Sequence, residues 1–196
     1  MTAQFPITHE IAQQLIAAPH NEKLALGRKL ICIDGPAGSG KTTLATELSD
    51  RLSSQNVTST IIHMDSLYDG WGEPLGKVLR DRLRTVVLPA ISTGKNFSLP
   101  AFDWLIDAWG EPQKYESAQV IILEGVGSFQ KMSRSFASLG IWIEVSAELG
   151  RERVLERDGF HLEPQIKHWQ KKEREHFAAE GTKAISDFQL VGSDRG

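Results

Sequence analysis

Short apolar runs alternate along this chain with longer stretches in which apolar residues recur every three or four positions. The first run, 29–34, is apolar on both faces, which is typical of a strand in the middle of a parallel sheet. Strands are predicted at 29–34, 57–63, 119–124, 140–145 and 188–191. Helices are predicted at 42–52, 147–157 and 163–180. Alternating strands and helices predict an α/β protein with a mostly parallel sheet.

Two of these helices have recognisable details. In the helix 42–52, Leu44, Leu48 and Leu52 share one face, which we expect to pack on the sheet. The helix 163–180 begins with Pro164 near its first position and ends before a glycine, both of which are common at helix boundaries. Its charged run 171–175 predicts a solvated helix face.

Residues 66–118 form too long a segment for a simple connection between two parallel strands. A helical pattern near Leu75–Leu83 is followed by a stretch rich in aromatic residues. We interpret the segment as an insertion over the carboxyl edge of the sheet, where open α/β folds bind ligands. Its tryptophans, Trp71, Trp104 and Trp109, either stack on a flat ligand or fill the insertion's own core, and the second is the favoured expectation.

The length of 196 residues predicts a single domain, 1–196. Within it we expect a helical N-terminal extension (1–28), a substrate-side insertion (66–118) and a lid with the helix that follows it (147–180). The composition, 40% hydrophobic and 24% charged, is that of a soluble globular protein.

Charge and cysteine content narrow the class of protein. A net charge of −3 gives no electrostatic reason to expect a nucleic acid or a membrane surface as partner. The single cysteine, Cys32, has no partner for an internal disulfide. No apolar run reaches the length of a membrane span, and the first 20 residues lack the pattern of a signal peptide. We therefore expect a cytoplasmic monomer or homodimer.

The motif that carries chemistry is Gly-Pro-Ala-Gly-Ser-Gly-Lys-Thr at 35–42, a full match to the phosphate-binding P-loop. It follows a predicted strand and opens a predicted helix, which is the context that the motif requires. Lys41 supplies a positive charge for the β- and γ-phosphates, and the Thr42 hydroxyl is placed to ligate Mg²⁺. The predicted nucleotide-binding residues are Gly35, Ala37, Gly38, Ser39, Gly40, Lys41, Thr42 and Thr43.

Three carboxylates lie where predicted strands or the insertion meet loops: Asp65, Asp103 and Glu124. Each one alone could be an ordinary turn or cap residue. Beside a P-loop a functional role is favoured for them, since parallel strands end at the same edge of the sheet as the phosphates. Phosphoryl transfer needs a carboxylate near the metal and a group that orients the attacking hydroxyl.

These segments together resemble the uridine kinase and phosphoribulokinase group of P-loop kinases. The resemblance rests on residues 35–43, Met64–Tyr68, 94–104, Leu123–Gly125 and the pair Arg157-Asp158, and it covers roughly residues 29–192. It implies a three-layer fold with strand order 2-3-1-4-5, with ATP and Mg²⁺ as cofactors. It also implies a nucleoside-like or other polyol metabolite as acceptor.

The resemblance also implies roles for single residues. Asp65 matches the acid that accepts the proton of the attacking hydroxyl, with a second place near the metal, and Glu124 matches the acidic residue near Mg²⁺. Asp103, together with Tyr68 and Trp104, is expected to bind the acceptor. Lys41, Arg153 and Arg157 are expected to be catalytic with Asp65, the two arginines closing over the phosphates. The alternative for the arginines is a solvated helix face paired with Glu148, Glu152 and Glu156.

The chain also departs from the uridine kinase pattern. Leu67 stands where that family has a phenylalanine, and the histidine and arginine that follow the acid matching Asp103 are missing. The residues that would recognise a pyrimidine are therefore not evident.

Three functions are compatible with these observations. The favoured one is a small-molecule kinase that transfers the γ-phosphoryl group of ATP, or of GTP as the alternative donor, to a hydroxyl. The others are a regulatory NTPase that switches partner binding and an ATP-binding protein without catalysis. The guanine-specifying N-K-x-D motif and the L-S-G-G-Q motif are both absent from the sequence.

Overall fold

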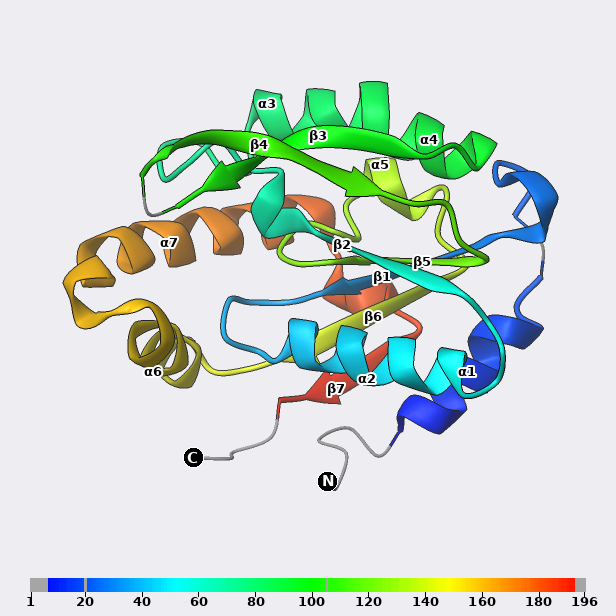
Figure 1. The fold of residues 1–196 in the computed structure, drawn as a ribbon. Helices are drawn as coiled ribbons and strands as arrows, with labels where there is room; N and C mark the ends of the chain where they lie inside the picture. The colour runs from blue at the N-terminus through cyan, green and yellow to red at the C-terminus, as the bar shows by residue number, and fades with distance from the viewer. Residues whose placement is uncertain (1–6, 20, 105, 193–196) are drawn as a thin grey trace.

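The computed structural model describes residues 7–19, 21–104 and 106–192. At its centre lies a five-stranded parallel sheet in the order β2-β5-β1-β6-β7 (Figure 1). The strands are β1 (Lys29–Asp34), β2 (Ser59–His63), β5 (Val120–Glu124), β6 (Leu139–Glu144) and β7 (Phe188–Val191). Counted along the chain, these five strands have the predicted order 2-3-1-4-5, so the predicted fold class and topology are confirmed.

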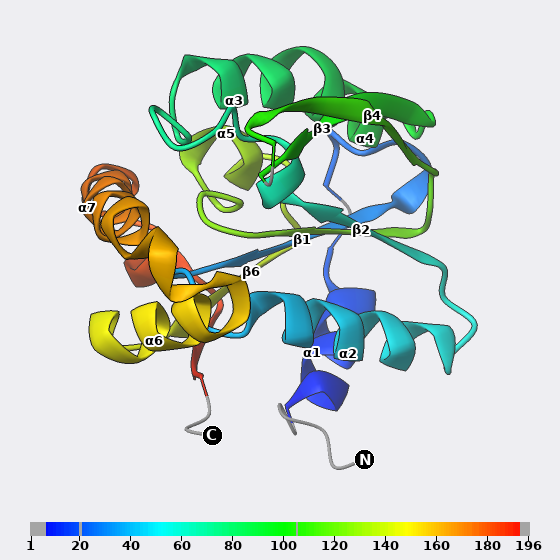
Figure 2. The ribbon, with the colours of Figure 1, turned by 60° about the vertical axis from the view of Figure 1, so that its left-hand side comes forward.

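The helices cover both faces of the sheet. On one face lie α1 (Thr8–Ala17) and α2 (Lys41–Ser53), and on the other lie α5 (Lys131–Arg134) and most of the insertion (Figures 1 and 2). Alternate residues of β1 pack on opposite faces of the sheet. Ile31 and Ile33 pack with α1 and α2, whereas Leu30 and Cys32 pack with the insertion. Burial on both faces explains why the run 29–34 is apolar without alternation.

Two helices flank the carboxyl end of the sheet, α6 (Ala147–Asp158) and α7 (Glu163–Glu180). The predicted bounds of α7 are confirmed, α2 is one residue longer than predicted at each end, and α6 is one residue longer at its C-terminal end. The side chain of Ser146 caps α6 by accepting the backbone N–H of Leu149. Residues 1–6 and 20 of the predicted N-terminal extension lie outside the described residues.

The insertion contains an element that the sequence pattern did not predict, the antiparallel hairpin of β3 (Phe97–Asp103) and β4 (Ala108–Tyr115). Pro100 and Pro112 face each other in this two-stranded ladder. Proline weakens the sequence signal of a strand because it donates no ladder hydrogen bond and is confined to sheet edges. A hairpin with two edges accommodates both prolines.

The helical part of the insertion is one irregular helix. It consists of α3 (Lys77–Arg82), a π-helical turn (Leu83–Val87) and α4 (Leu88–Thr93). The widened turn ends two residues before Pro89, which has no N–H to donate to the helix. In the part of the chain that the structure describes, no helix combines the length and apolarity needed to cross a membrane.

Candidate active site

A cavity of about 550 Å³ opens at the carboxyl end of the sheet. It is lined by the loop after β1, the residues that follow β2 and β5, and parts of α6 and α7. Of the residues predicted for the site, it brings together Ala37, Gly38, Gly40, Lys41, Thr42, Thr43, Asp65, Trp104, Glu124, Arg153 and Arg157. The edge of the sheet predicted to bind ligands therefore carries the cavity.

The P-loop connects β1 to α2 with a backbone that requires glycine. Gly38 has a φ of +77°, and a Cβ there would lie 2.3 Å from the carbonyl oxygen of Gly150 in α6. The loop thus packs backbone against backbone on α6. Gly35 and Ser39, also predicted to bind nucleotide, are buried in the loop and are not among the residues that line the cavity.

Lys41 is buried at the start of α2, and its side chain folds back to contact the P-loop. Its ammonium donates to the carbonyl oxygen of Pro36 at 2.7 Å and contacts Oγ of Ser39 at 3.4 Å. An ammonium has three donors, so these contacts still leave capacity for a phosphate oxygen. The first turn of α2 points its free N–H groups and positive dipole end at the same space.

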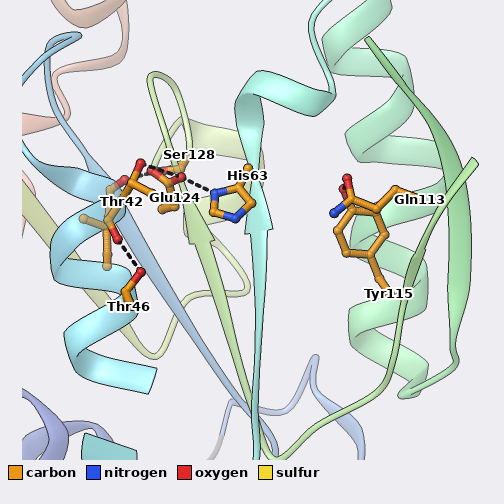
Figure 3. Close-up of polar contacts among 8 residues, drawn as sticks. Thr42, Thr46, His63, Gln113, Tyr115, Glu124 and Ser128 are labelled. Atoms are coloured by element: carbon orange, nitrogen blue, oxygen red, sulfur yellow. Dashed lines mark hydrogen bonds and ion pairs between the residues drawn. The ribbon is translucent and has the colours of Figure 1, made fainter. Parts of the chain in front are cut away.

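Glu124 is the buried acid at the end of β5, and it joins two strands and the P-loop helix (Figure 3). Its Oε1 accepts the hydroxyl of Thr42 at 3.1 Å and lies 2.5 Å from Nδ1 of His63. His63 is opposite Glu124 in the register of β2 and β5. The hydrogen bond to this carboxylate raises the pKa of His63. Sequence reasoning missed His63, although its place at the end of a strand beside Met64-Asp65 was a usable signal.

Asp65 lies in the short 3-10 turn Met64–Ser66 that follows β2, and it lines the cavity. Its side chain is open to solvent in the cavity yet surrounded by protein on most sides. Removal from bulk water is the largest cause that raises the pKa of this carboxyl, and the negative charge of Glu124 adds to it. Lys41 and Arg157 act in the opposite direction. Asp65 is therefore a more basic carboxylate than one in free solution.

The two predicted lid arginines both line the cavity from α6. Arg153 donates from Nη1 to the carbonyl oxygen of Gly38 at 3.1 Å, which connects α6 to the P-loop. Arg157 forms a two-pronged pair with Asp158, with both N···O distances at 2.7 Å. One arginine thus contacts the phosphate-binding loop directly, and the other is held at the cavity by its sequence neighbour.

Of the residues predicted to bind the acceptor through the insertion, some line the cavity and others do not. Trp104 lines the cavity, and its indole N–H donates to the carbonyl oxygen of Asp65 at 3.0 Å. Tyr68 is fully buried behind Trp104 and donates its hydroxyl to the carbonyl oxygen of Val126 at 2.7 Å. Asp103, at the end of β3, is not among the residues that line the cavity. Acceptor binding by Tyr68 and Asp103 stays a prediction.

The tryptophans divide between the two expectations for them. Trp71 and Trp104 line the cavity while also packing on the core beneath it. Trp109 lies outside the cavity, where Arg82 stacks over its ring at 4.0 Å. Trp71 and Trp104 therefore pack on the core as expected and are also exposed to the cavity, so stacking on a flat ligand stays a prediction for them. Trp169 of α7 joins them there, and sequence reasoning missed it.

The prediction of a solvated face at 171–175 is wrong for Glu173. This residue is 4% exposed, and its Oε2 accepts both the backbone N–H of Ala37 at 3.0 Å and the indole N–H of Trp169 at 3.1 Å. Burial raises the pKa of Glu173. The signal was helical spacing, since Ile166, Trp169 and Glu173 recur three and four residues apart.

The strand order, the glycine-rich loop at the end of β1 and the cavity beside it define a P-loop nucleotide-binding protein. The family model described as an AAA domain matches residues 31–175, so the chain belongs to this family.

Known relatives agree with the resemblance seen in the sequence. A uridine kinase from Lactobacillus helveticus (strain DPC 4571) is 28% identical over 142 residues, which cover 66% of this chain and 67% of the relative. A solved structure described as a possible uridine kinase from Bacillus stearothermophilus has a TM-score of 0.69 and 20% identity, over 93% of this chain and 96% of the other. The D-glycerate 3-kinase from Cryptococcus neoformans var. grubii has a TM-score of 0.61 and 12% identity, over 95% of each chain. The fold is therefore that of the uridine kinase-like P-loop kinases.

Proposed function

We propose that this chain is a phosphotransferase that moves the γ-phosphoryl group of ATP to a hydroxyl of a small metabolite, with Mg²⁺ as cofactor. The observation that carries the proposal is a single cavity in which Lys41 and Thr42 of the P-loop meet the carboxylates of Asp65 and Glu124. The names of the relatives, uridine kinase and D-glycerate 3-kinase, support the same class of reaction. A nucleoside-like alcohol is the first acceptor class to test.

The donor set at the P-loop fits Mg²⁺. The hydroxyl of Thr42 and the carboxylate of Glu124 lie within 3.1 Å of each other, and both are oxygen ligands of the type that Mg²⁺ prefers. Sites for Mg²⁺ beside nucleotides commonly use one or two protein oxygens and complete the shell with phosphates and water. When bound, the ion would neutralise charge on the phosphate oxygens.

The chain's own residues supply the remaining parts of phosphoryl transfer. Asp65 orients the acceptor hydroxyl and accepts its proton, a role for which a raised pKa is favourable. Lys41 binds phosphate oxygens from within the loop, and Arg153 and Arg157 offset the charge that spreads over the transferring group. The lid helix α6, packed on the loop, would limit access of water to the phosphates.

The test is ADP release with ATP and Mg²⁺ against a panel of nucleosides, sugars and other alcohols, with Lys41→Ala as the blank. An acceptor that raises turnover above the blank identifies a kinase. In Asp65→Asn we expect turnover to fall about 10²–10⁴-fold with ATP binding retained, because only the hydroxyl loses its base. Unchanged turnover in Asp65→Asn would contradict the role given to that residue.

Two other results would point to the remaining functions. Slow hydrolysis of ATP that no acceptor stimulates would favour a regulatory NTPase. Stabilisation by ATP and Mg²⁺ in a thermal-shift assay, without turnover on any acceptor, would favour a nucleotide-binding protein without catalysis.

A further inference from the structure

Part of the cavity lining consists of apolar side chains that pack close to Ala37 of the P-loop. It is formed by Trp71, Trp104, Val126, Leu162, Ile166 and Trp169. No function assigned above uses these side chains as a group. Ligand pockets commonly pair a few polar groups that act on the reacting atoms with an apolar surface that binds the rest of the ligand.

Two of the three indoles have already used their only polar group. Trp104 donates its N–H to the carbonyl oxygen of Asp65, and Trp169 donates its N–H to Glu173. Both rings therefore present carbon to the cavity. Such a surface matches a ligand by shape and apolarity, and it lacks the set of donors and acceptors that would recognise the edge of a nucleobase.

The three rings contact one another and form a continuous wall. Their centroids are 4.8 Å apart for Trp71 and Trp104, 6.2 Å for Trp104 and Trp169, and 6.5 Å for Trp71 and Trp169. All three pairs are edge-to-face, at interplanar angles of 70°, 78° and 82°. A cage for a quaternary ammonium needs a hollow between its rings, and these rings fill that space with each other. The wall is therefore suited to an apolar ring or chain lying against it.

The wall stands on the acceptor side of the cavity. Trp104 is bonded to the backbone of Asp65, the residue that receives the acceptor's proton in the proposed reaction. Asp65 follows β2 and Val126 follows β5. Both strands lie on the same side of β1, because β5 is next to β1 and β2 is next to β5. A hydroxyl held at Asp65 would leave the rest of the same molecule next to the indoles.

We infer that the acceptor is an alcohol whose body is an apolar ring, held against the wall of Trp71, Trp104 and Trp169. This inference rests on the proposed function for the identity of the reacting hydroxyl. The wall would bind such a body without nucleotide, because no phosphate group contributes to its surface. Binding of this kind differs from the recognition of a pyrimidine, which depends on hydrogen bonds to the edge of the base.

The test uses three primary alcohols on the full chain: 2-phenylethanol, uridine and choline. Binding is measured without nucleotide by saturation-transfer NMR and titration. The variants are Trp71→Ala and Trp71→Phe, with Trp109→Ala as the matched control, because Trp109 lies in the same insertion but outside the cavity. Binding of ATP to each variant, measured by calorimetry, reports whether the P-loop remains intact.

We expect 2-phenylethanol to bind and to be weakened about tenfold or more by Trp71→Ala, as for loss of one well-packed aromatic contact. Trp71→Phe should retain most of the affinity, Trp109→Ala should retain all of it, and ATP should bind all variants alike. Binding of uridine or choline in preference to 2-phenylethanol would overturn the inference. Equal loss of ATP binding in Trp71→Ala would also overturn it, since the wall would then hold the adenine ring.

Turnover separates this inference from the proposed function. If 2-phenylethanol binds at the wall but no alcohol stimulates ADP release, the proposed kinase activity fails while the apolar site is upheld. If sugars or uridine stimulate ADP release and 2-phenylethanol neither binds nor reacts, the kinase activity is upheld and the inference about the wall fails.

Discussion

The cavity lining has two parts, the P-loop and the neighbouring wall of three indoles, and they bind by different kinds of group. At the P-loop, residues 35–43 present backbone N–H groups and one ammonium, and any added Cβ at Gly38 meets neighbouring backbone. At the wall, the rings of Trp71, Trp104 and Trp169 pack on one another, and Tyr68 packs behind Trp104 and Trp169. The first part depends on backbone conformation, which changes little when distant side chains change. The second depends on side-chain packing, so it is the part where substrate preference can vary among proteins of one fold.

Glu173 connects the P-loop to the wall of indoles. The same carboxylate oxygen accepts an N–H from Ala37 in the P-loop and from Trp169 in the wall. Movement of α7 would therefore alter both the phosphate site and the apolar wall. Substitutions that disturb one part, the link or the lid test how independent the two parts are.

The largest effect is expected at the base of the P-loop, in Asp34→Asn. The buried carboxylate of Asp34 accepts backbone N–H groups of Gly35, Gly127 and Phe129 at 2.8, 2.8 and 2.9 Å. An asparagine would turn its NH₂ toward at least one of these donors. We expect the free energy of unfolding to fall by about 3 kcal/mol in urea titrations, with the exposed Asp50→Asn unchanged. Equal stability of the two variants would show that these bonds do not hold the loop.

Asp34 also makes the free energy of unfolding depend on pH. Burial raises its pKa from 3.8 to about 6, against the opposing effect of the three N–H bonds. The folded protein thus holds this proton more tightly than the unfolded chain. The contribution to stability is full below about pH 4 and is lost as the pH rises through about 6, a change of about 3 kcal/mol. Unfolding measured from pH 4 to pH 7 should show this loss in the parent chain and not in Asp34→Asn.

An intermediate effect is expected from breaking the link. Glu173→Ala leaves the N–H groups of Ala37 and Trp169 without their acceptor, at a cost of about 2 kcal/mol. Affinity for both ATP and 2-phenylethanol should fall, whereas Glu173→Gln, which retains one carbonyl oxygen, should restore most of each. Glu175→Ala, exposed on the same helix, is the control. Loss of affinity for only one of the two ligands in Glu173→Ala would show that the P-loop and the wall are not coupled through this residue.

The smallest effect on stability is expected in the lid. A Cβ on Gly150 would lie 2.6 Å from the carbonyl oxygen of Ala37. Alanine gains about 1 kcal/mol in helix propensity, and the contact with backbone costs about 1–3 kcal/mol, so we expect a net loss of stability of about 1 kcal/mol. Turnover should fall nevertheless, because α6 carries Arg153 and Arg157. Gly72→Ala, with no atom near its added Cβ, serves as the control in the ADP-release assay. Full activity of Gly150→Ala would show that contact between the lid and the loop is not needed.

The sequence by itself determined the sheet, its strand order through the family resemblance, and the phosphate end of the site. The strands and the phosphate end depend on local patterns: a two-sided apolar strand, helical periodicity and glycine spacing whose backbone geometry is the same wherever it occurs. Asp65 and Glu124 were found for the same reason, because parallel strands end at one edge.

Only the tertiary structure decided the rest. The hairpin β3–β4 was hidden by Pro100 and Pro112, which a two-stranded edge tolerates. Glu173 looked like part of a solvated charged run until α7 was placed against the P-loop. Trp71, Trp104 and Trp169 come from three separate segments, and nothing in their local sequence says that the rings meet. Local spacing can indicate which side chains of a helix are buried, but which distant segments they pack against is decided by the tertiary structure.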